Sequence, residues 1–400
     1  MSDNPVDITH GATSGAPELL ARAAAAETRA HDGLAVAIHD FFLPDEARLD
    51  ERTRASLSLL LRALVETVEA EIRENGARLL SERGEARLSA AMLRTEASVC
   101  DRLFDSGLLR DPALMTELIA RVRQDAIAAA LPLNAPDNPE RPSLVNRFVQ
   151  HPDRALASGA MAVLIAESRR RGDPDAEHLT QTDLPAELHC RLVWWVAAAL
   201  RERVGEVADG ALPVLDRALS DAAQRSLAAY DEGDRLEGAA MRFAAAIDAQ
   251  PDELPRMLVE ALGDRRIVLF IALLAHALGV SYALAREIVL ESGAERLWLA
   301  LRALDLGREA IAHVGFALCE ADPRRDVERF ADRLDAILAI ASDDARDAIA
   351  PLRLDPDYRA ALLALARTGG RHERDRSLDP RVVRAARPRG TADRRRGASG

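Results

Sequence analysis

The sequence predicts an all-α protein of stacked antiparallel helical hairpins, either a HEAT-like solenoid or an irregular helical array. Hydrophobic residues make up 48% of the 400 residues and aromatic residues only 4%. The apolar content is therefore mostly alanine and leucine, which favour helices over strands. Apolar residues recur at intervals of three and four, the spacing of one helix face. A pattern also recurs at 267–292 and 293–318, and repeated helical pairs are typical of solenoid packing.

The first third of the chain is expected to form a disordered polar leader at 1–16 and an N-terminal helical array at 17–131. Its clearest helix has an apolar stripe formed by Leu57, Leu60, Leu61, Leu64, Val65, Val68 and Ile72. The opposite, polar face carries Arg62, Glu66, Glu69 and Arg73. Asn75-Gly76 is expected to weaken or end this helix. Shorter helices are expected at 86–94 and 95–105, and an Asp111-Pro112 cap should start another that reaches Ala130.

Four prolines predict a linker at 132–142. A C-terminal helical array is expected at 143–368, and a disordered arginine-rich tail at 369–400. Asp183 and Pro185 should start a helix in which the neighbouring Trp194 and Trp195 indicate burial on more than one side. The other helices are expected at 143–150, 152–171, 209–229, 234–249, 252–262, 324–341 and 343–366.

The recurring pattern at 267–318 has an offset of 26 residues. Ala277-Leu278 recurs as Ala303-Leu304, and Ile288 as Val314. Each copy is expected to form a helix, a tight turn and a second helix. Gly279 and Ser281 should supply the turn and the next N-cap in the first copy. Asp305 and Gly307 occupy the matching positions in the second.

Charge is distributed unevenly. The chain has no lysine, so all 53 basic residues are arginine, and lysine-dependent catalysis is excluded. Residues 371–400 hold ten arginines and four acids, a net charge of +6, and the rest of the chain carries −18. An acidic body repels nucleic acid and anionic membranes, whereas the tail could bind either or fold back on the body.

The sequence points to a cytoplasmic protein. It has no apolar run of the length that a transmembrane helix needs, and residues 1–13 lack the pattern of a secretory signal. Cys100, Cys190 and Cys319 are far apart and odd in number, which is typical of reduced thiols.

Residues 267–292 also allow a DNA-binding helix-turn-helix, in which the second helix would enter the major groove. That helix would present Tyr282, Arg286 and Glu287, with Glu291 beyond. One basic side chain and two acidic ones are poorly suited to contact DNA phosphates, so a helical hairpin of the protein core is favoured over a DNA-binding motif. Arg394, Arg395 and Arg396 are the densest point of the tail and its possible contact with a ligand. The tail has no aromatic residue for base stacking.

No residues are assigned to catalysis, cofactor binding or metal binding. Glu309 and His313 are spaced i, i+4, and His189-Cys190 lies near His178, but no second pair completes a metal site. His276 and His313 are expected to be partly buried with backbone partners. The sequence has neither a Gly-x-Ser-x-Gly nor a Gly-x-Gly-x-x-Gly motif, and nothing near Cys100 would lower the pKa of its thiol.

Several stretches together resemble an all-helical bacterial family, domain of unknown function 2336, found mostly in alphaproteobacteria. The N-terminal resemblance lies in Leu60 to Val65, Val68-Glu69 and Ile72-Arg73, and continues from Val99 to Phe104 and through Ser106, Leu108-Leu109, Asp111 and Leu114. The C-terminal resemblance runs from Phe270 to Ile288 and from Leu301 to Leu306. The resemblance implies short antiparallel helices related to HEAT-like repeats and transfers no site.

The leading hypothesis is a non-enzymatic helical-repeat protein that acts as a scaffold or regulator and binds a protein partner the sequence does not name. Long polar faces of stacked hairpins typically serve this role. The alternative is a nucleic-acid-associated regulator that uses the arginine-rich tail. The third hypothesis is an enzyme whose site is scattered across helices. No cofactor and no membrane insertion are expected.

Overall fold

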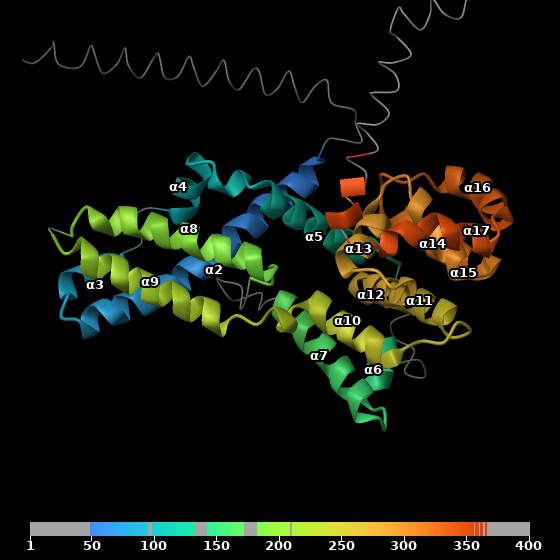
Figure 1. Cartoon of the computed structure of the whole chain (residues 1–400), viewed down its shortest axis with the longest axis horizontal. Coiled ribbons are helices and arrows are strands. Elements are labelled where there is room, and N and C mark those ends of the chain that lie inside the picture. Colours follow the sequence, from blue (N-terminus) through green and yellow to red (C-terminus); the bar gives the residue numbers. More distant parts are fainter. Residues whose placement is uncertain are drawn as a thin grey trace, which may run out of the picture. The chain divides into compact units, whose positions relative to one another are not determined.

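The computed structural model describes residues 49–94, 98–132, 142–171, 182–208 and 210–355, together with 357–359, 361–362 and 365. These residues form α-helices and short 3₁₀ turns joined by loops, with no strand among them, so the predicted all-α class is confirmed (Figure 1). The predicted leader and tail, and all but the edges of the predicted linker, lie outside these residues.

The chain divides into two compact units, each made of separate segments. Unit 1 comprises Met1–Ala126 and Arg191–Gln224, and unit 2 comprises Ile127–Cys190 and Arg225–Gly400. Residues 191–224 thus group with the N-terminal residues, which the hydrophobic pattern did not anticipate. The pattern shows which face of a helix is buried but not which distant helix covers it.

Unit 1 is organised around one long helix, α2 (Glu51–Glu82), which contacts α3 and α4. It also includes residues 191–205 of α8 and residues 212–224 of α9. The other helical elements that lie in it wholly or in part are α3 (Ala86–Leu93), α4 (Val99–Asp105), η2 (Leu108–Arg110), α5 (Pro112–Ala130), α8 (Ala186–Gly205) and α9 (Leu212–Ala229). Asp111 caps α5 as predicted, because its Oδ1 accepts from the Leu114 N–H at 2.9 Å.

Two expectations about α2 were wrong. The helix continues through Asn75-Gly76, because a Cβ at Gly76 would have 3.7 Å to Met92 and 3.8 Å to Leu219, so the position is packed rather than free to turn. Burial of the residues that follow outweighs the poor helix propensity of glycine. Glu69 is buried rather than solvent-exposed, and its Oε1 lies 3.8 Å from Arg73 and 3.2 Å from Arg203.

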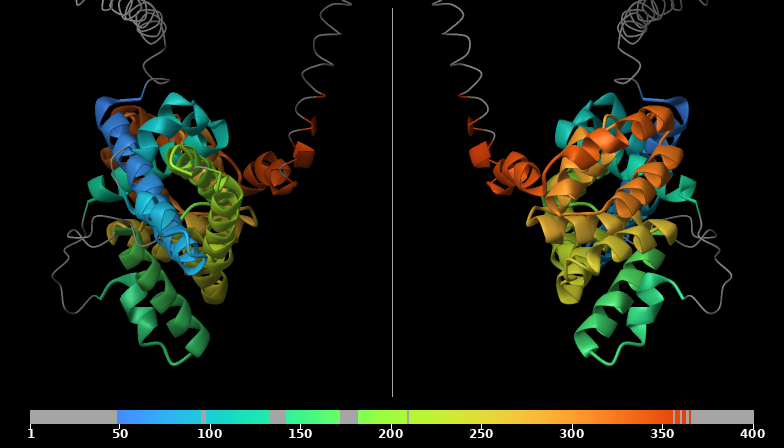
Figure 2. Two further views of the ribbon diagram at one scale, coloured as in Figure 1. Left: turned by 90° about the vertical axis from the view of Figure 1, so that its left-hand side faces the viewer. Right: turned by 90° about the vertical axis from the view of Figure 1, so that its right-hand side faces the viewer.

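Unit 2 holds the remaining helices. Helices α6 and α7 lie side by side and are coloured green in Figure 2. Helix α10 packs on both α7 and α12, and α11 packs on α12 and α15. The elements are α6 (Leu144–Val149), α7 (Arg154–Arg171), η3 (Glu232–Asp234), α10 (Leu236–Ile247), α11 (Leu254–Gly263), α12 (Ile267–Leu278), α13 (Tyr282–Leu290), α14 (Glu295–Ala303), α15 (Arg308–Ala321), α16 (Val327–Ala339), α17 (Ser342–Ile349) and η4 (Ala350–Arg353).

Residues 267–321 form two successive helix–turn–helix segments, α12–α13 and α14–α15. The matching positions Gly279 and Asp305 both adopt the left-handed conformation, with φ of +67° and +58°. Ser281 caps α13 as predicted, and its Oγ accepts from the Leu284 N–H at 3.3 Å. Gly307 precedes α15 at the matching position without a side-chain cap. Two offset-related segments therefore make the same turn.

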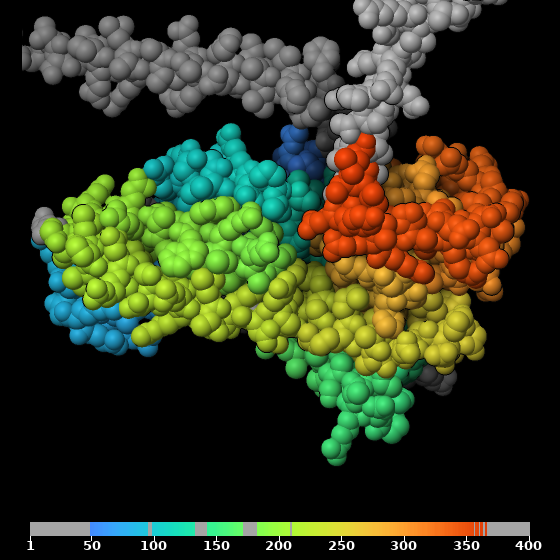
Figure 3. Space-filling view, in the orientation of Figure 1, coloured from blue at the N-terminus to red at the C-terminus, as the bar shows by residue number. Residues whose placement is uncertain are grey.

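The final helix and one tryptophan differ from expectation. The helix predicted at 343–366 is interrupted: α17 ends at Ile349 and η4 follows, because Pro351 cannot continue the backbone hydrogen bonds of a helix, and helical residues recur at 357–359, 361–362 and 365. Most side chains of α17 are exposed, on the orange-red surface in Figure 3. Trp194 is 41% exposed, so α8 is not buried on its side.

No single helix in the described ranges has the length and apolar character to cross a membrane. Helices α12 and α13 meet that criterion only when taken together, and they are bent by 116° at the break between them. Nearly all of α12 is buried within the protein, from Ile267 to Ala275.

Candidate functional site

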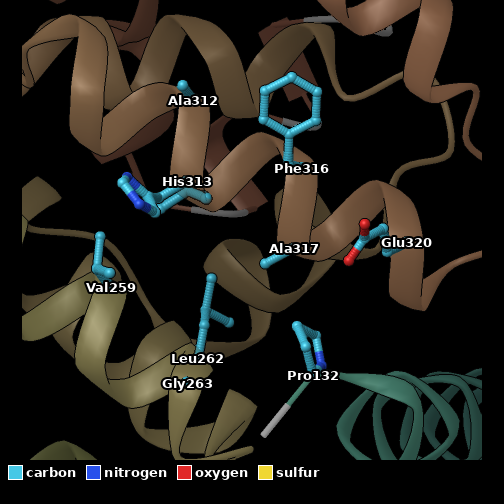
Figure 4. Close-up of a pocket in the computed structure, with 10 residues that line it drawn as sticks. Pro132, Val259, Leu262, Gly263, Ala312, His313, Phe316, Ala317 and Glu320 are labelled. Atoms are coloured by element: carbon cyan, nitrogen blue, oxygen red, sulfur yellow. The ribbon is translucent and has the colours of Figure 1, made fainter. Parts of the chain in front are cut away.

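One cavity of unit 2 lies between α11 and α15 and has a volume of about 390 Å³. Figure 4 shows its lining. Helix α11 contributes Val259, Leu262 and Gly263, Pro132 also lines the cavity, and the other lining residues belong to α15. The α15 residues that line it are Ala312, His313, Val314, Phe316, Ala317 and Glu320. We call this cavity the α11–α15 pocket.

Helical spacing explains why these side chains converge. Val259, Leu262 and Gly263 are spaced i, i+3, i+4 and lie on one face of α11. On α15, Ala312 and Phe316 are one turn apart, and the small Ala317 side chain leaves space beside the larger Phe316. The small side chains on the facing sides of α11 and α15 thus leave space between the two helices unfilled, and this space forms the pocket.

Only two titratable side chains line the pocket. His313 donates its Nδ1–H to the Glu309 carbonyl oxygen at 2.8 Å, because a carbonyl can only accept, and this leaves Nε2 for a ligand. Glu320 is exposed, and its carboxylate has no ion-pair partner among the residues that the structure describes. The rim is therefore an acceptor of hydrogen bonds and carries a negative charge.

Phe316 is the most prominent apolar side chain of the pocket, with 38% of its surface exposed. Its ring meets Phe330 of α16 edge-on, with centroids 5.3 Å apart. The Phe330 ring in turn lies 4.8 Å from Trp298. Gly315 makes this arrangement possible, because a Cβ at that position would overlap the tip of the Phe330 ring. We call Phe316, Phe330 and Trp298 the aromatic row.

Unit 1 has an apolar pocket of its own, with a volume of about 320 Å³. Its lining consists of Leu57, Ser58, Leu61, Phe104, Leu109, Arg110 and Met115. Phe104 is 56% exposed, and the Arg110 guanidinium lies 6.0 Å from the centre of its ring. The predicted stripe of α2 thus has two uses, since Leu64 and Ile72 fill the core while Leu57 and Leu61 face this pocket.

Unit 2 also contains a buried polar cluster. Arg170 donates from Nε to Asp183 at 2.5 Å and from Nη2 to Glu237 at 2.5 Å. Burial opposes ionisation of Glu237, but Arg170 and Arg235 outweigh it and lower the pKa of this carboxyl to about 2. His189 stacks on Tyr230 with ring centroids 4.0 Å apart, and burial lowers the pKa of His189 to about 4. This imidazole is therefore neutral at pH 7.

The residues singled out from the sequence are not brought together into one site. Arg286 is buried and Glu287 pairs with Arg296 at 2.9 Å, so α13 presents no free basic face for a DNA groove. Glu309 and His313 share one turn of α15 through a backbone hydrogen bond, and no group of three metal-ligating side chains forms within the described ranges. His178 and the tail residues Arg394, Arg395 and Arg396 lie outside those ranges.

The structure shows the surroundings of His276, His313 and two of the cysteines. His313 has the expected backbone partner but is exposed, whereas His276 is half-buried and its Nε2 lies 3.0 Å from Asp248 Oδ1. Burial raises the pKa of the Cys100 and Cys319 thiols, which disfavours the reactive thiolate.

The sequence did not reveal the α11–α15 pocket. The alternation of small and large residues at Ala312, Phe316 and Ala317 was the signal available for it.

Comparison with known proteins identifies one family. Residues 138–350 match the family model described as an uncharacterised protein conserved in bacteria (DUF2336). The matched range includes the C-terminal resemblance and all of the α11–α15 pocket except Pro132, while the N-terminal resemblance lies outside it. No curated protein and no solved structure matched the chain. Because the family model covers more than half of the 400 residues, the chain belongs to this family of uncharacterised bacterial proteins.

Proposed function

We propose that the chain is a non-enzymatic, cytoplasmic helical-repeat protein that acts as a scaffold or regulator by binding a protein partner in the α11–α15 pocket. The observation that carries the proposal is a pocket of about 390 Å³ whose lining is almost entirely apolar and whose rim exposes Phe316. Exposed aromatic side chains beside a fitted cavity are typical anchors of protein interfaces.

The chemistry of the rim supports one kind of partner. Glu320 supplies a carboxylate that has no ion-pair partner among the described residues, and His313 presents its Nε2. A partner helix with a large apolar side chain for the pocket and an arginine or lysine one turn away would satisfy both groups. The net charge of −18 outside residues 371–400 would speed association with such a basic segment.

Two similar helix–turn–helix segments support a helical-repeat architecture. Helices α12–α13 and α14–α15 share an offset of 26 residues and a left-handed turn residue at Gly279 and Asp305. Repeat proteins use surfaces formed by successive hairpins to bind partners. The pocket lies on the second of these two segments, at the α15 face that contacts α11.

The experiment that tests the proposal uses the pocket as its variable. A photo-crosslinking amino acid at position 316 captures the partner in the native cells, with nuclease present; amine-reactive reagents would find no lysine in this chain. Purified partner is then titrated against the unmodified protein and against Ala317→Arg, which fills the pocket. Leu354→Arg, at an exposed leucine outside the pocket, is the matched control.

We expect Ala317→Arg to weaken binding at least tenfold and Leu354→Arg to leave it unchanged. Glu320→Arg should weaken binding, and a charge reversal in the partner should restore it. If Ala317→Arg and Glu320→Arg bind the partner as tightly as the unmodified protein and the Leu354→Arg control do, the pocket is not the binding site. Cytoplasmic location is tested by fractionation of the same cells.

Nucleic-acid association through the tail is the second candidate, favoured by the ten arginines of residues 371–400. It requires that binding fall steeply with salt and disappear when 371–400 is deleted. Captured partners that vanish with nuclease would favour this candidate over the pocket, whereas salt-insensitive binding that survives the deletion would exclude it.

A further inference from the structure

A second, chemically different cavity lies where α14 and α16 begin. It has a volume of about 80 Å³ and is lined by four arginines, Arg324, Arg325, Arg329 and Arg333. Asp326 is the only acidic residue among its lining residues, which otherwise include the loop Ser292–Ala294, Cys319 and the aromatic rings of Trp298 and Phe330. This concentration of positive charge stands in a chain whose net charge is −12. We call this cavity the arginine pocket.

Arg325 is buried, with 7% of its surface exposed. Its Nη2 donates to the carbonyl oxygens of Val289 and Glu291, and its Nε lies 3.4 Å from Asp322 Oδ2. Its Nη1 has no hydrogen-bond partner within the described part of the chain. A buried guanidinium that lines a cavity and has an unused donor is costly without a partner, and an anion in the cavity would provide one.

The four arginines have different capacities to bind a ligand. Arg324 is occupied, because its Nε and Nη2 bind both Asp322 oxygens at 2.9 Å and 2.7 Å. Arg329 is exposed and has no ion-pair partner among the described residues. Arg333 has one partner, Glu295, whose Oε1 lies 3.3 Å from Nη1. Arg325, Arg329 and Arg333 therefore retain donors for a ligand.

The loop before α14 adds backbone donors. Within the described residues, no hydrogen bond is donated by the backbone N–H of Gly293 or Ala294. Both precede the first residue of α14, where the helix dipole also favours an anion. The Glu295 side chain lies against Gly293 and pairs with Arg333, so a carboxylate of the protein itself already lies at the edge of the cavity.

From these observations we propose that the arginine pocket binds a phosphate dianion, either free or as a phosphoryl group on a larger molecule that extends outside. A dianion matches the excess of lining guanidinium groups over carboxylates better than a single carboxylate does. Guanidinium groups bind phosphate oxygens through paired, charge-assisted hydrogen bonds. A cavity of about 80 Å³ has room for the phosphoryl group but not for a whole nucleotide. The site is separate from the α11–α15 pocket, so either proposal can fail alone.

Trp298 provides a direct readout because it lines the cavity. The remaining tryptophans, Trp194 and Trp195, lie in unit 1 and can be replaced by phenylalanine. Inorganic phosphate is titrated into this single-tryptophan protein at constant ionic strength, with chloride as the reference anion. We expect a saturable change in Trp298 fluorescence with phosphate and none with chloride.

Variants at the rim test the assignment without disturbing the buried Arg325. Arg329→Gln and Arg333→Gln should each weaken phosphate binding about tenfold, as expected for loss of one charge-assisted hydrogen bond. Glu295→Gln should tighten binding, because it removes a competing carboxylate. Arg256→Gln, at an exposed arginine on α11, is the control and should change nothing. No saturable change, an equal response to chloride, or equal affinity in the Arg329→Gln, Arg333→Gln double variant would overturn the proposal.

A last titration identifies the source of the phosphate. A phosphoserine peptide, its unphosphorylated twin and free phosphoserine are compared in the same assay. Tighter binding of the phosphopeptide than of free phosphoserine would indicate a phosphorylated protein, and equal binding of the two would indicate a small phosphate ester. Binding of the unphosphorylated twin as strong as that of the phosphopeptide would contradict phosphate recognition.

Discussion

Replacing Gly315 with alanine tests the close packing of the aromatic row. The added Cβ would overlap the Phe330 ring, which is 4% exposed and held between Phe316 and Trp298. The ring cannot move outward without losing both aromatic contacts, so we expect an overpacking cost of about 1–3 kcal/mol. Alanine gains about 1 kcal/mol over glycine within a helix. The expected net effect is destabilisation by up to about 2 kcal/mol.

The assay is urea unfolding followed by circular dichroism at 222 nm. Gly315→Ala should lower the midpoint without changing the slope, as expected when stability alone changes. Gly76→Ala is the matched control, since it is also a buried helical glycine but a Cβ there would have an ordinary contact of 3.7 Å with Met92. That control should stabilise the protein by up to about 1 kcal/mol.

A double-mutant cycle isolates the contact. In a Phe330→Leu background the overlap disappears, and Gly315→Ala should then be neutral or slightly stabilising. The coupling energy between positions 315 and 330 should therefore be about 1–3 kcal/mol. A midpoint for Gly315→Ala equal to or above that of the parent, or additive effects in the double variant, would refute close packing between α15 and α16.

Three further predictions concern capping and buried charge. Ser281→Ala should lower the unfolding free energy by about 1 kcal/mol in urea denaturation, since the Leu284 N–H loses its acceptor. Glu237→Gln should cost about 3–5 kcal/mol at pH 7, because Arg170 and Arg235 lose a buried partner. Its folded pKa of about 2 lies below the usual 4.5, so the difference from the parent protein should shrink as pH falls from 4.5 towards 2. The pKa of His189 is about 4 in the folded protein and 6.5 in the unfolded chain, so the parent protein should lose stability as pH falls from 6.5 to 4. His189→Gln should remove this loss, which is measured as the urea midpoint at each pH.

The hydrophobic pattern predicted the helices because each apolar stripe reports local periodicity. The Asp111 and Ser281 caps were correct for the same reason, since a cap depends on residues within one turn. The pattern was wrong where a non-local contact or a covalent constraint decided the outcome. Gly76 stays helical because Met92 and Leu219 pack against it, and the helix predicted at 343–366 is interrupted after Ile349 because of Pro351.

The candidate sites were harder to predict because each depends on side chains from different helices. The α11–α15 pocket joins Leu262 and Phe316, which are 54 positions apart in the sequence. In the arginine pocket, the run from Arg324 to Arg333 resembles any charged helix face. What distinguishes it is the burial of Arg325 and its unused Nη1, and neither property can be read from residue order.

The aromatic row connects the two proposed sites and determines how they must be tested. Phe316 lines the α11–α15 pocket, Trp298 lines the arginine pocket, and Phe330 contacts both rings. Substitution of Phe330 would therefore disturb both cavities and could not assign binding to either. Ala317 lines only the first pocket, and Arg329 and Arg333 line only the second. Because both cavities lie almost wholly within residues 138–350, these rim positions also offer the most direct comparison with other members of the family.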